Sequence, residues 1–185
     1  MDKGRIAALS DGIVAIAATI MALELAVPEV LSMESLRGQF PTFFAYFVSF
    51  TLIYLGWRSH HNAFQKAERI NSAVFLTNGL WLLLVSLIPF ATGLIGRHPD
   101  SSIAAVVYVL VVGSWTLSFQ FLDIAVTKAN PDAPKDEVRA PVARVILFGG
   151  YALSLVLAFF VPRAPLFVIA LSSLVMGIRI IKGNR

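Results

Sequence analysis

A carboxylate with polar neighbours lies in the first apolar segment of the chain. Residues 5–27 form a membrane-length apolar run, and Asp11 lies about two helical turns into it, close to Arg5 and Ser10. Lipid excludes unpaired charge, so an ionisable side chain in such a run indicates a functional site and needs partners. The chemistry to consider first is therefore charge pairing or ion handling inside a membrane.

A second polar group ends the next apolar segment. The stretch WRSHHNAF at 57–64 places Trp57 beside the adjacent pair His60 and His61. Adjacent residues on a helix point about 100° apart, so we expect one histidine to pack inward and the other to face the interface. The inward histidine is expected to bond Asp11 or Ser10, and the indole N–H of Trp57 needs an acceptor at the same depth.

A metal site would need ligands beyond the two histidines. The chain has no cysteine, and the acids available for such a site are Asp11, Glu68 and Asp123. Because adjacent histidines on a helix rarely chelate one ion together, we expect no metal and no cofactor.

Asn78, in the third apolar segment, is the remaining polar candidate. A buried amide in lipid needs partners, so we expect Asn78 to join a network with Arg5, Asp11 and His60. Arg5 can pair with Asp11 of its own chain or of a neighbour. The network has a structural interpretation, in which it pins the first three helices together, and an alternative one, gating or proton sensing through histidine.

One face of the first segment carries a stripe of branched side chains. At helical spacing, this face collects Gly12, Ile16, Thr19, Ile20 and Leu23. Ile16 lies about 17 Å beyond Arg5, near mid-membrane. Copies of such a stripe around an axis would form apolar rings that gate ions by dewetting, with a threonine hydroxyl beside them. The commoner interpretation is packing against other helices or lipid, with Thr19 bonding the carbonyl four residues back.

Two further acids lie near segment ends. Glu24 is either a rim charge that attracts cations or the point where the helix leaves the membrane. Asp123 is expected to be a boundary charge that can pair with Lys128.

The composition is that of a membrane protein with almost no soluble part. Hydrophobic residues make up 57% of the 185 residues and charged residues 14%, against about 25% charged in soluble domains. The mean hydropathy is +0.77. The net charge of +4 is dispersed over short loops rather than gathered in a patch, which excludes a nucleic-acid partner.

Six apolar segments are long enough to cross a bilayer as helices, which predicts an all-α polytopic domain covering residues 1–185. They span residues 5–27, 40–58, 73–95, 102–127, 141–161 and 164–182, and most are bounded by prolines such as Pro28, Pro41, Pro99 and Pro134. Pro89 inside the third segment is expected to kink it. Twelve of fifteen Lys and Arg residues fall on one side of this arrangement, which predicts cytoplasmic termini.

These motifs resemble the transmembrane protein 175 family of potassium channels. The pattern Arg5-x-x-x-Leu9-Ser10-Asp11-Gly12, continuing IVAIAATIMALEL, is similar to the opening helix of that family. WRSHHNAF is similar to its Trp-x-x-His-His motif, and NGLWLLLVSLIPFATGL at 78–94 to its third helix. Leu9 departs from the family, which prefers phenylalanine there, and should lose an aromatic contact behind the Ser-Asp pair.

The resemblance implies a potassium-selective channel in a bacterial inner membrane, with lipids around it. It implies a homotetramer in which the first helices line the pore, with the main constriction at Ile16, further rings at Ile20 and Leu23, and potassium selection by Thr19. It also implies a supporting network, formed by Arg5, Ser10, Asp11, Trp57, His60 and Asn78.

Two other classes of function are considered. A secondary transporter would couple ions or protons through Asp11 and the His60/His61 pair, but it needs acids near mid-membrane and usually has internal repeats. A membrane enzyme would use the same groups for acid–base chemistry. The sequence offers no nucleophile for it, so we expect no enzyme activity.

Overall fold

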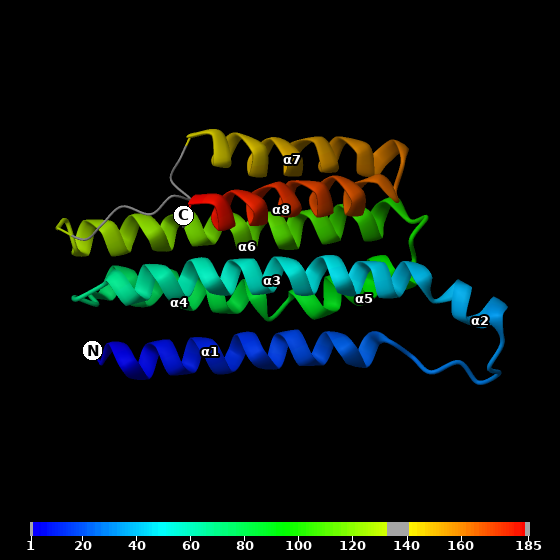
Figure 1. Cartoon of the computed structure of the whole chain (residues 1–185), viewed down its shortest axis with the longest axis horizontal. Coiled ribbons are helices and arrows are strands. Elements are labelled where there is room, and N and C mark those ends of the chain that lie inside the picture. The colour runs from blue at the N-terminus through cyan, green and yellow to red at the C-terminus, as the bar shows by residue number, and fades with distance from the viewer. Residues whose placement is uncertain (1, 133–140, 184–185) are drawn as a thin grey trace.

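The computed structural model describes residues 2–132 and 141–183, and this part of the chain is built from helices alone (Figure 1). The elements are α1 (Lys3–Ile20), the 3₁₀ turn η1 (Met21–Glu24), α2 (Met33–Gly38), α3 (Phe40–Lys66), α4 (Ser72–Val85), α5 (Ile88–Arg97), α6 (Ser102–Ala129), α7 (Pro141–Phe160) and α8 (Ala164–Gly183). The all-α prediction is confirmed. In lipid, helices satisfy their backbone groups internally, which is why an apolar chain of this kind adopts them.

Four stretches are long and apolar enough to cross a membrane. These are Lys3–Glu24, Phe40–Lys66, Ser72–Arg97 and Ser102–Ala129, which match the first four predicted spans. The apolar parts of α7 and α8 that the structure describes, Val145–Phe160 and Ala164–Ile178, are shorter. The count of six spans therefore stays a prediction. The predicted loop around Pro134 falls within 133–140, outside the described residues.

Several boundaries differ from those predicted. The regular part of α1 ends at Ile20, and η1 then continues to Glu24, so the segment stops short of Val27. Helix α3 runs on to Lys66 rather than ending at residue 58, because the WRSHHNAF stretch contains no proline or glycine to stop it. The short helix α2, held by a capping box between Ser32 and Ser35, was not predicted.

The third apolar segment is broken where Pro89 predicts a kink. Helix α4 ends at Val85 and α5 begins at Ile88, with Pro89 in the first turn of α5. Proline lacks an N–H and its ring clashes with the carbonyl four residues earlier, here that of Val85. The predicted kink is confirmed.

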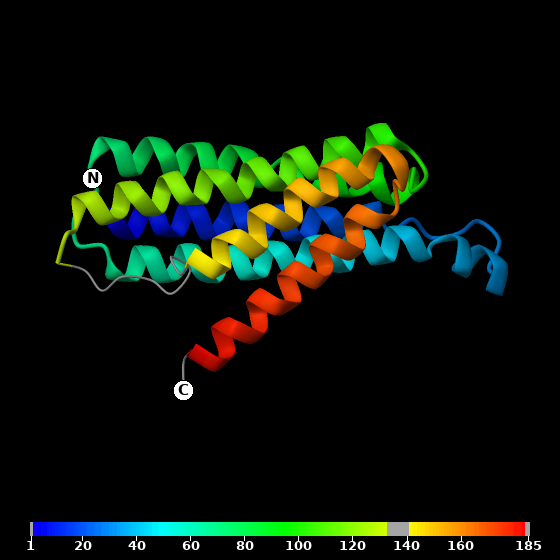
Figure 2. The same ribbon diagram turned by 90° about the horizontal axis from the view of Figure 1, so that it is seen from above.

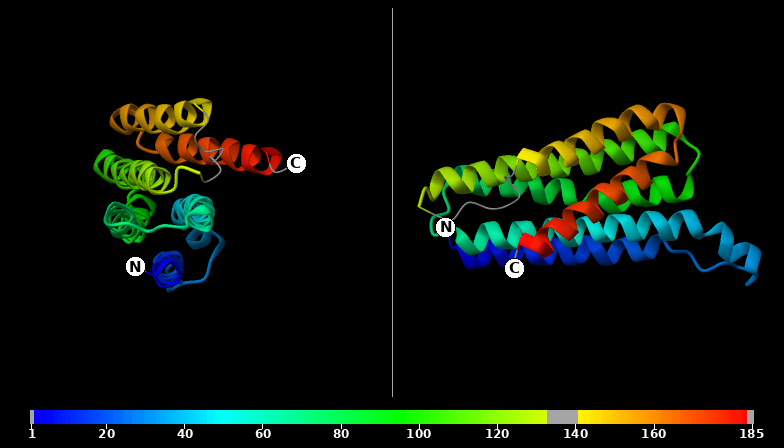
Figure 3. Two further views of the ribbon diagram at one scale, coloured as in Figure 1. Left: turned by 90° about the vertical axis from the view of Figure 1, so that its left-hand side faces the viewer. Right: turned by 45° about the horizontal axis from the view of Figure 1, so that its top comes forward.

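The helices form a layered bundle in which α1 occupies one edge. Figure 3, left, shows α1 on one side, then α3 beside α4 and α5, then α6, and α7 with α8 on the far side. Helix α4 packs on α6, α3 on α5, and α7 on α8, whereas α1 packs on α3, α4 and α5, with α3 its most extensive single contact among them. One face of α1 is thereby left free of its own chain.

Polar side chains fasten the bundle at its two ends. At one end, buried Asn130 accepts hydrogen bonds from the backbone N–H groups of Glu68 (2.9 Å) and Arg69 (2.7 Å), which ties the α3–α4 turn to the end of α6. At the other end, Arg163 donates two hydrogen bonds to Asp100, at 2.6 and 2.8 Å. Helix α8 runs back toward the end of the bundle where α1 begins, and in Figure 2 its last turns diverge from the other helices (Figures 1 and 2).

Candidate functional site on helix α1

Helix α1 has one face inside the bundle and another outside it. The buried side chains recur every three or four residues and are those of Ile6, Ser10, Val14, Ala17 and Met21. On a helix this spacing defines a single stripe, which here faces α3, α4 and α5. The residues predicted to line a pore fall on a different face.

The exposed face carries the predicted stripe. Ile16 is 59% exposed, Ile20 44% and Leu23 79%, and Thr19 is also exposed. The Thr19 hydroxyl donates to the Ile16 carbonyl at 2.9 Å, three residues back rather than the four considered from sequence. With its proton used in this way, the threonine oxygen can still accept or coordinate on the open side of the helix.

Leu9 lies on the same open face and is 58% exposed. An aromatic residue at this position would therefore not pack behind Ser10 and Asp11 within the chain. The expected loss of an internal contact at Leu9 is wrong for the single chain, because the side chain points away from the bundle.

Asp11 bonds to α3 through a tryptophan. The indole Nε1 of Trp57 donates to Asp11 Oδ1 at 2.8 Å. Asp11 is exposed and borders a groove between α1 and α3 whose other walls include Ala15, Phe50 and Tyr54. This bond links the polar end of α1 to α3.

A second, buried chain of hydrogen bonds joins three helices. Nε2 of His60 on α3 lies 2.7 Å from Oδ1 of Asn78 on α4, and Asn78 Nδ2 donates to Ser10 Oγ on α1 at 3.1 Å. Ser10 in turn donates to the carbonyl of Ile6 at 2.9 Å. Because Asn78 donates to Ser10, its oxygen accepts from His60, so the chain runs in one direction with each group satisfied.

His60 is held by aromatic rings as well as by Asn78. Its ring stacks on Phe64 and on Trp81, with centroids 4.4 Å apart in each pair. The expectation that His60 bonds Asp11 or Ser10 directly is wrong, because Asn78 lies between His60 and Ser10. Phe64 and Trp81 were missed from sequence, although Phe64 is one helical turn beyond His60 and could have been found by that spacing.

His61 and Arg5 do not join either group. His61 faces Gln65 on its own helix, at 2.8 Å, and its ring lies 5.4 Å from that of Trp57. Arg5 is exposed, and no pair between Arg5 and Asp11 is present in the described chain. Of the six residues expected to form one network, the structure brings five together as two separate groups.

The far end of α1 carries a different set of contacts. Glu24 pairs with Arg97 on α5 at 2.7 Å, and its carboxylate lies against Gly93 where a larger residue would collide with it. Glu24 is therefore paired rather than a free rim charge. Asp123, expected at a boundary, is buried within the bundle.

A buried hydroxyl cluster near this end was not foreseen from sequence. Thr92 donates to Ser49 at 2.8 Å and its Oγ1 lies 3.6 Å from the sulfur of Met21, while Ser49 lies 2.9 Å from the Tyr108 hydroxyl. These residues are far apart along the chain, so only the fold reveals the cluster. Over the described residues, no group of three or more His, Asp or Glu side chains is arranged to hold a metal.

The sequence is similar to that of known bacterial proteins over most of its length. It is 32% identical over 164 residues to the protein named potassium channel HX13_20290 from a Chryseobacterium species, which covers 88% of this chain and 85% of that protein. The family model described as endosomal/lysosomal potassium channel TMEM175 matches residues 5–89, a range that contains the pore stripe and both hydrogen-bonded groups of α1. The chain belongs to the TMEM175 family.

The fold of the TMEM175 family is also matched. A crystal structure described as a lysosomal potassium-selective channel TMEM175 homolog from Chamaesiphon minutus superposes with a TM-score of 0.79 at 30% identity, covering 96% of this chain and 97% of that one. The resemblance inferred from the first three segments is thus confirmed, and the protein is a multi-pass membrane protein.

Relatives in the TMEM175 family carry two functional names. The human relative, named endosomal/lysosomal proton channel TMEM175, is 31% identical over 121 residues, which is 57% of this chain but only 24% of the human protein.

Proposed function

We propose that this protein is a potassium-selective channel, assembled as a homotetramer with α1 lining the pore. The observation that carries the proposal is the open face of α1, which presents Ile16, Thr19 and Ile20 away from the chain's own bundle. Membership of a family whose bacterial relatives are named potassium channels supports the choice of ion.

The composition of the open face favours a pore over contact with lipid. The exposed face of α3 carries large aromatic side chains, including Phe43, Phe47 and Phe50, as is common for surfaces in lipid. Helix α1 has no aromatic residue, and its open side contains Gly12 and several alanines. Small residues let helices approach closely, which a narrow pore formed by four copies requires.

Each functional side chain has a role in this arrangement. Four copies of Ile16 form the main constriction, and Ile20 and Leu23 form further rings. Narrow apolar rings gate ions because water leaves them and a hydrated ion cannot pass. The Thr19 oxygen, one turn beyond Ile16, offers a ligand to a dehydrated cation and favours potassium.

The two hydrogen-bonded groups support the pore helix. The His60–Asn78–Ser10 chain fixes α1 against α3 and α4, and the Trp57–Asp11 bond fixes its rotation. Arg5, exposed in the single chain, reaches a neighbouring copy at the same level. The supporting role of all six residues is part of the proposal.

The proposed topology has six spans with both termini in the cytoplasm of a bacterial cell, in the inner membrane. The excess of Lys and Arg on one side supports this orientation, as does the return of α8 to the end where α1 begins.

The decisive experiment is the reversal potential of the purified protein in a planar bilayer, with potassium on one side and sodium on the other. We expect a current that reverses toward the potassium equilibrium potential. A pH gradient imposed in place of the cation gradient tests the second candidate, proton permeation, which the name of the human relative raises. A current that follows only the pH gradient would overturn potassium selectivity while leaving a channel.

Substitution of the constriction tests the lining directly. We expect Ile16→Asn to raise the single-channel conductance several-fold and to weaken selectivity for potassium over sodium, because an amide wets the ring. The matched control is Ile103→Asn, which makes the same change at a residue of α6 that is 76% exposed and far from α1 in sequence. Unchanged currents in Ile16→Asn would remove this residue from the pore.

The transporter alternative receives no support from the geometry. Asp11, His60 and His61 each bond a different partner, so they do not form one relay for coupled protons.

A further inference from the structure

The far end of α1 continues as a 3₁₀ turn rather than as an α-helix. The α-helical part ends at Ile20, and η1 covers Met21–Glu24. A 3₁₀ helix has about three residues per turn, so residues i and i+3 project on the same side, whereas in an α-helix they lie about 60° apart. In η1, Leu23 therefore lies in line with Ile20, and Glu24 lies in line with Met21.

The two sides of η1 have opposite environments. Met21 is fully buried, whereas Leu23 is 79% exposed and Ile20 is 44% exposed. On the buried side, the sulfur of Met21 lies 3.6 Å from the hydroxyl oxygen of Thr92, a buried residue of α5. The turn thus packs on α5 with one side and continues the open stripe of α1 with the other.

Glu24 attaches the end of η1 to the same helix. Its carboxylate pairs with Arg97 of α5 at 2.7 Å and lies against Gly93, where any Cβ would overlap it. The side chain of Glu24 is 26% exposed and that of Arg97 is 61% exposed. Pairs this exposed contribute little to the stability of a fold, so the effect of this pair lies in where it holds the turn.

The end of η1 needs both attachments. Met21 fixes the start of the turn, and Glu24 fixes its rotation about the helix axis. The backbone leaves the helical conformation at Leu25, so no later turn holds Leu23 in place. Without the bond at Glu24, rotation of the turn would carry Leu23 away from the stripe.

We propose that Glu24 is a positioning residue, which orients Leu23 toward the pore axis through its bond to Arg97 and its contact with Gly93. The ring of Leu23 side chains forms only while this pair is intact. The inference rests on the proposed function, in which four copies of α1 surround the pore. It adds that one ring of the pore depends on a bond made outside it.

The test uses the absence of cysteine from the chain. Leu23→Cys places one thiol per copy at the proposed ring, where converging thiolates bind a soft cation such as Cd²⁺. In a planar bilayer with Cd²⁺ applied to both sides, we expect block of the potassium current. Adding Glu24→Ala to Leu23→Cys should raise the blocking concentration about ten-fold or more, because the thiols no longer point at one ion.

Matched variants, each added to Leu23→Cys, separate the position of Glu24 from its charge. Gly93→Ala keeps every charge but displaces the Glu24 carboxylate, so we expect the same loss of Cd²⁺ affinity. Gly38→Ala is its control, because nothing lies within 4 Å of a Cβ added there. Glu29→Ala removes an exposed carboxylate from the loop after η1 and controls for attraction of Cd²⁺ by charge. Both controls should change the block little.

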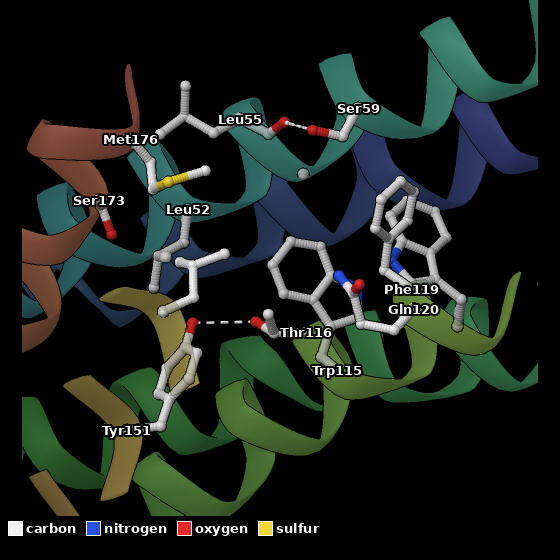
Figure 4. Close-up of a pocket in the computed structure, with 13 residues that line it drawn as sticks. Leu52, Leu55, Ser59, Trp115, Thr116, Phe119, Gln120, Tyr151, Ser173 and Met176 are labelled. Atoms are coloured by element: carbon white, nitrogen blue, oxygen red, sulfur yellow. Dashed lines mark hydrogen bonds between the residues drawn. The ribbon is translucent and has the colours of Figure 1, made fainter. Parts of the chain in front are cut away.

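A control elsewhere in the bundle separates positioning from loss of stability. Figure 4 shows the Tyr151 hydroxyl bonded to Thr116, at 2.9 Å, in a pocket between α3, α6 and the α7–α8 pair. Among the described residues that line this pocket, none belongs to α1 or η1. Tyr151→Phe should lower the midpoint of thermal unfolding and leave the Cd²⁺ block unchanged. Glu24→Ala should do the reverse.

Ile16→Cys distinguishes failure of this inference from failure of the proposed function. We expect Cd²⁺ to block Ile16→Cys equally with and without Glu24→Ala. If Leu23→Cys is not blocked, or if Glu24→Ala leaves its block unchanged, while Ile16→Cys is blocked, only the positioning role is overturned. If Cd²⁺ blocks neither variant, α1 does not line the pore and both fail.

Oxidative cross-linking gives a readout that needs no current. A disulfide requires Cβ atoms within about 4.5 Å, so its yield depends on where the thiols point. With copper phenanthroline, we expect Leu23→Cys to give covalent dimers and Glu24→Ala to reduce their yield. Equal yields with and without Glu24→Ala would overturn the proposal.

Discussion

At the scale of single residues, the polar end of α1 divides into a buried group and an exposed one. His60, Asn78 and Ser10 are each no more than 2% exposed, whereas Asp11 lies at the surface of the chain. Removing one member of a buried hydrogen-bonded chain leaves its partners unsatisfied, which costs far more than losing a bond that water or lipid headgroups can replace. The buried group should therefore dominate stability.

We expect Asn78→Leu to lower the free energy of unfolding by about 1–3 kcal/mol, because it removes the acceptor of the buried His60 N–H and the donor to Ser10, which keeps only its own bond to the Ile6 carbonyl. The midpoint of thermal unfolding, followed by tryptophan fluorescence, should fall by roughly 2–10 °C. Thr77→Val is the neighbouring control, since the Thr77 hydroxyl bonds only carbonyls of its own helix. Equal midpoints for the two variants would contradict the assigned role of Asn78.

The sequence was sufficient to name the polar residues but not their pairing. Asp11, Trp57, His60 and Asn78 stand out because polar groups are rare in apolar segments and must find partners there. Which partner each one takes depends on how far each helix is rotated about its axis and how closely it packs on its neighbours. Adjacent residues on a helix point about 100° apart, so a small rotation gives a side chain a different partner. Asn78 thus intervenes between His60 and Ser10, and Trp57 takes the carboxylate that either histidine could have taken.

At the scale of elements, the contact between α3 and α6 depends on one glycine. The Trp115 ring of α6 lies on Gly56 and stacks on Trp81, at a centroid distance of 5.7 Å. A side chain at position 56 would push the two helices apart or turn the ring. The packing distance of these helices is therefore set by the absence of a Cβ.

We expect Gly56→Ala to destabilise the protein by about 1–3 kcal/mol through overpacking. Gly79→Ala is the control, because nothing lies within 4 Å of a Cβ added there. That change should be neutral or stabilising by up to about 1 kcal/mol, as for glycine replaced by alanine in a helix. Thermal unfolding measures both. Recovery of stability by Trp115→Leu in the Gly56→Ala background would identify the ring as the source of strain, and no recovery would contradict it.

Element boundaries were predictable where a residue type dictates them. Pro89 removes a backbone donor, and it breaks the third segment as expected. The crossing angle of α7 and α8, by contrast, follows from which side chains interlock across helices distant in sequence. Apolar periodicity does not specify such angles, so the oblique crossing of α7 and α8 over the rest of the bundle was not foreseen (Figure 2).

At the scale of the whole molecule, the position of α1 at one edge suggests how copies assemble. A helix that uses one face to contact its own chain has another free to contact its neighbours. Gly12 lies on that free face, with nothing within 4 Å of an added Cβ in the single chain. A large residue there would leave the fold of one copy intact.

We expect native mass spectrometry of the detergent-solubilised protein to give a complex of four chains. Gly12→Phe should reduce it to smaller species, because a phenyl ring prevents close approach of the pore helices. Gly79→Phe, also free of neighbours within the chain, should remain a tetramer. Intact tetramers in Gly12→Phe would contradict assembly around α1.

The return of α8 toward the end of the bundle where α1 begins has a practical consequence for the proposed tetramer. With both termini on one side of the membrane, as proposed, a flexible linker can fuse two copies in tandem without an added crossing. A fused pair carrying Ile16→Asn in only one half fixes the dose of altered subunits at two in four. Conductance could then be read against stoichiometry, free of the random mixing that separate chains impose.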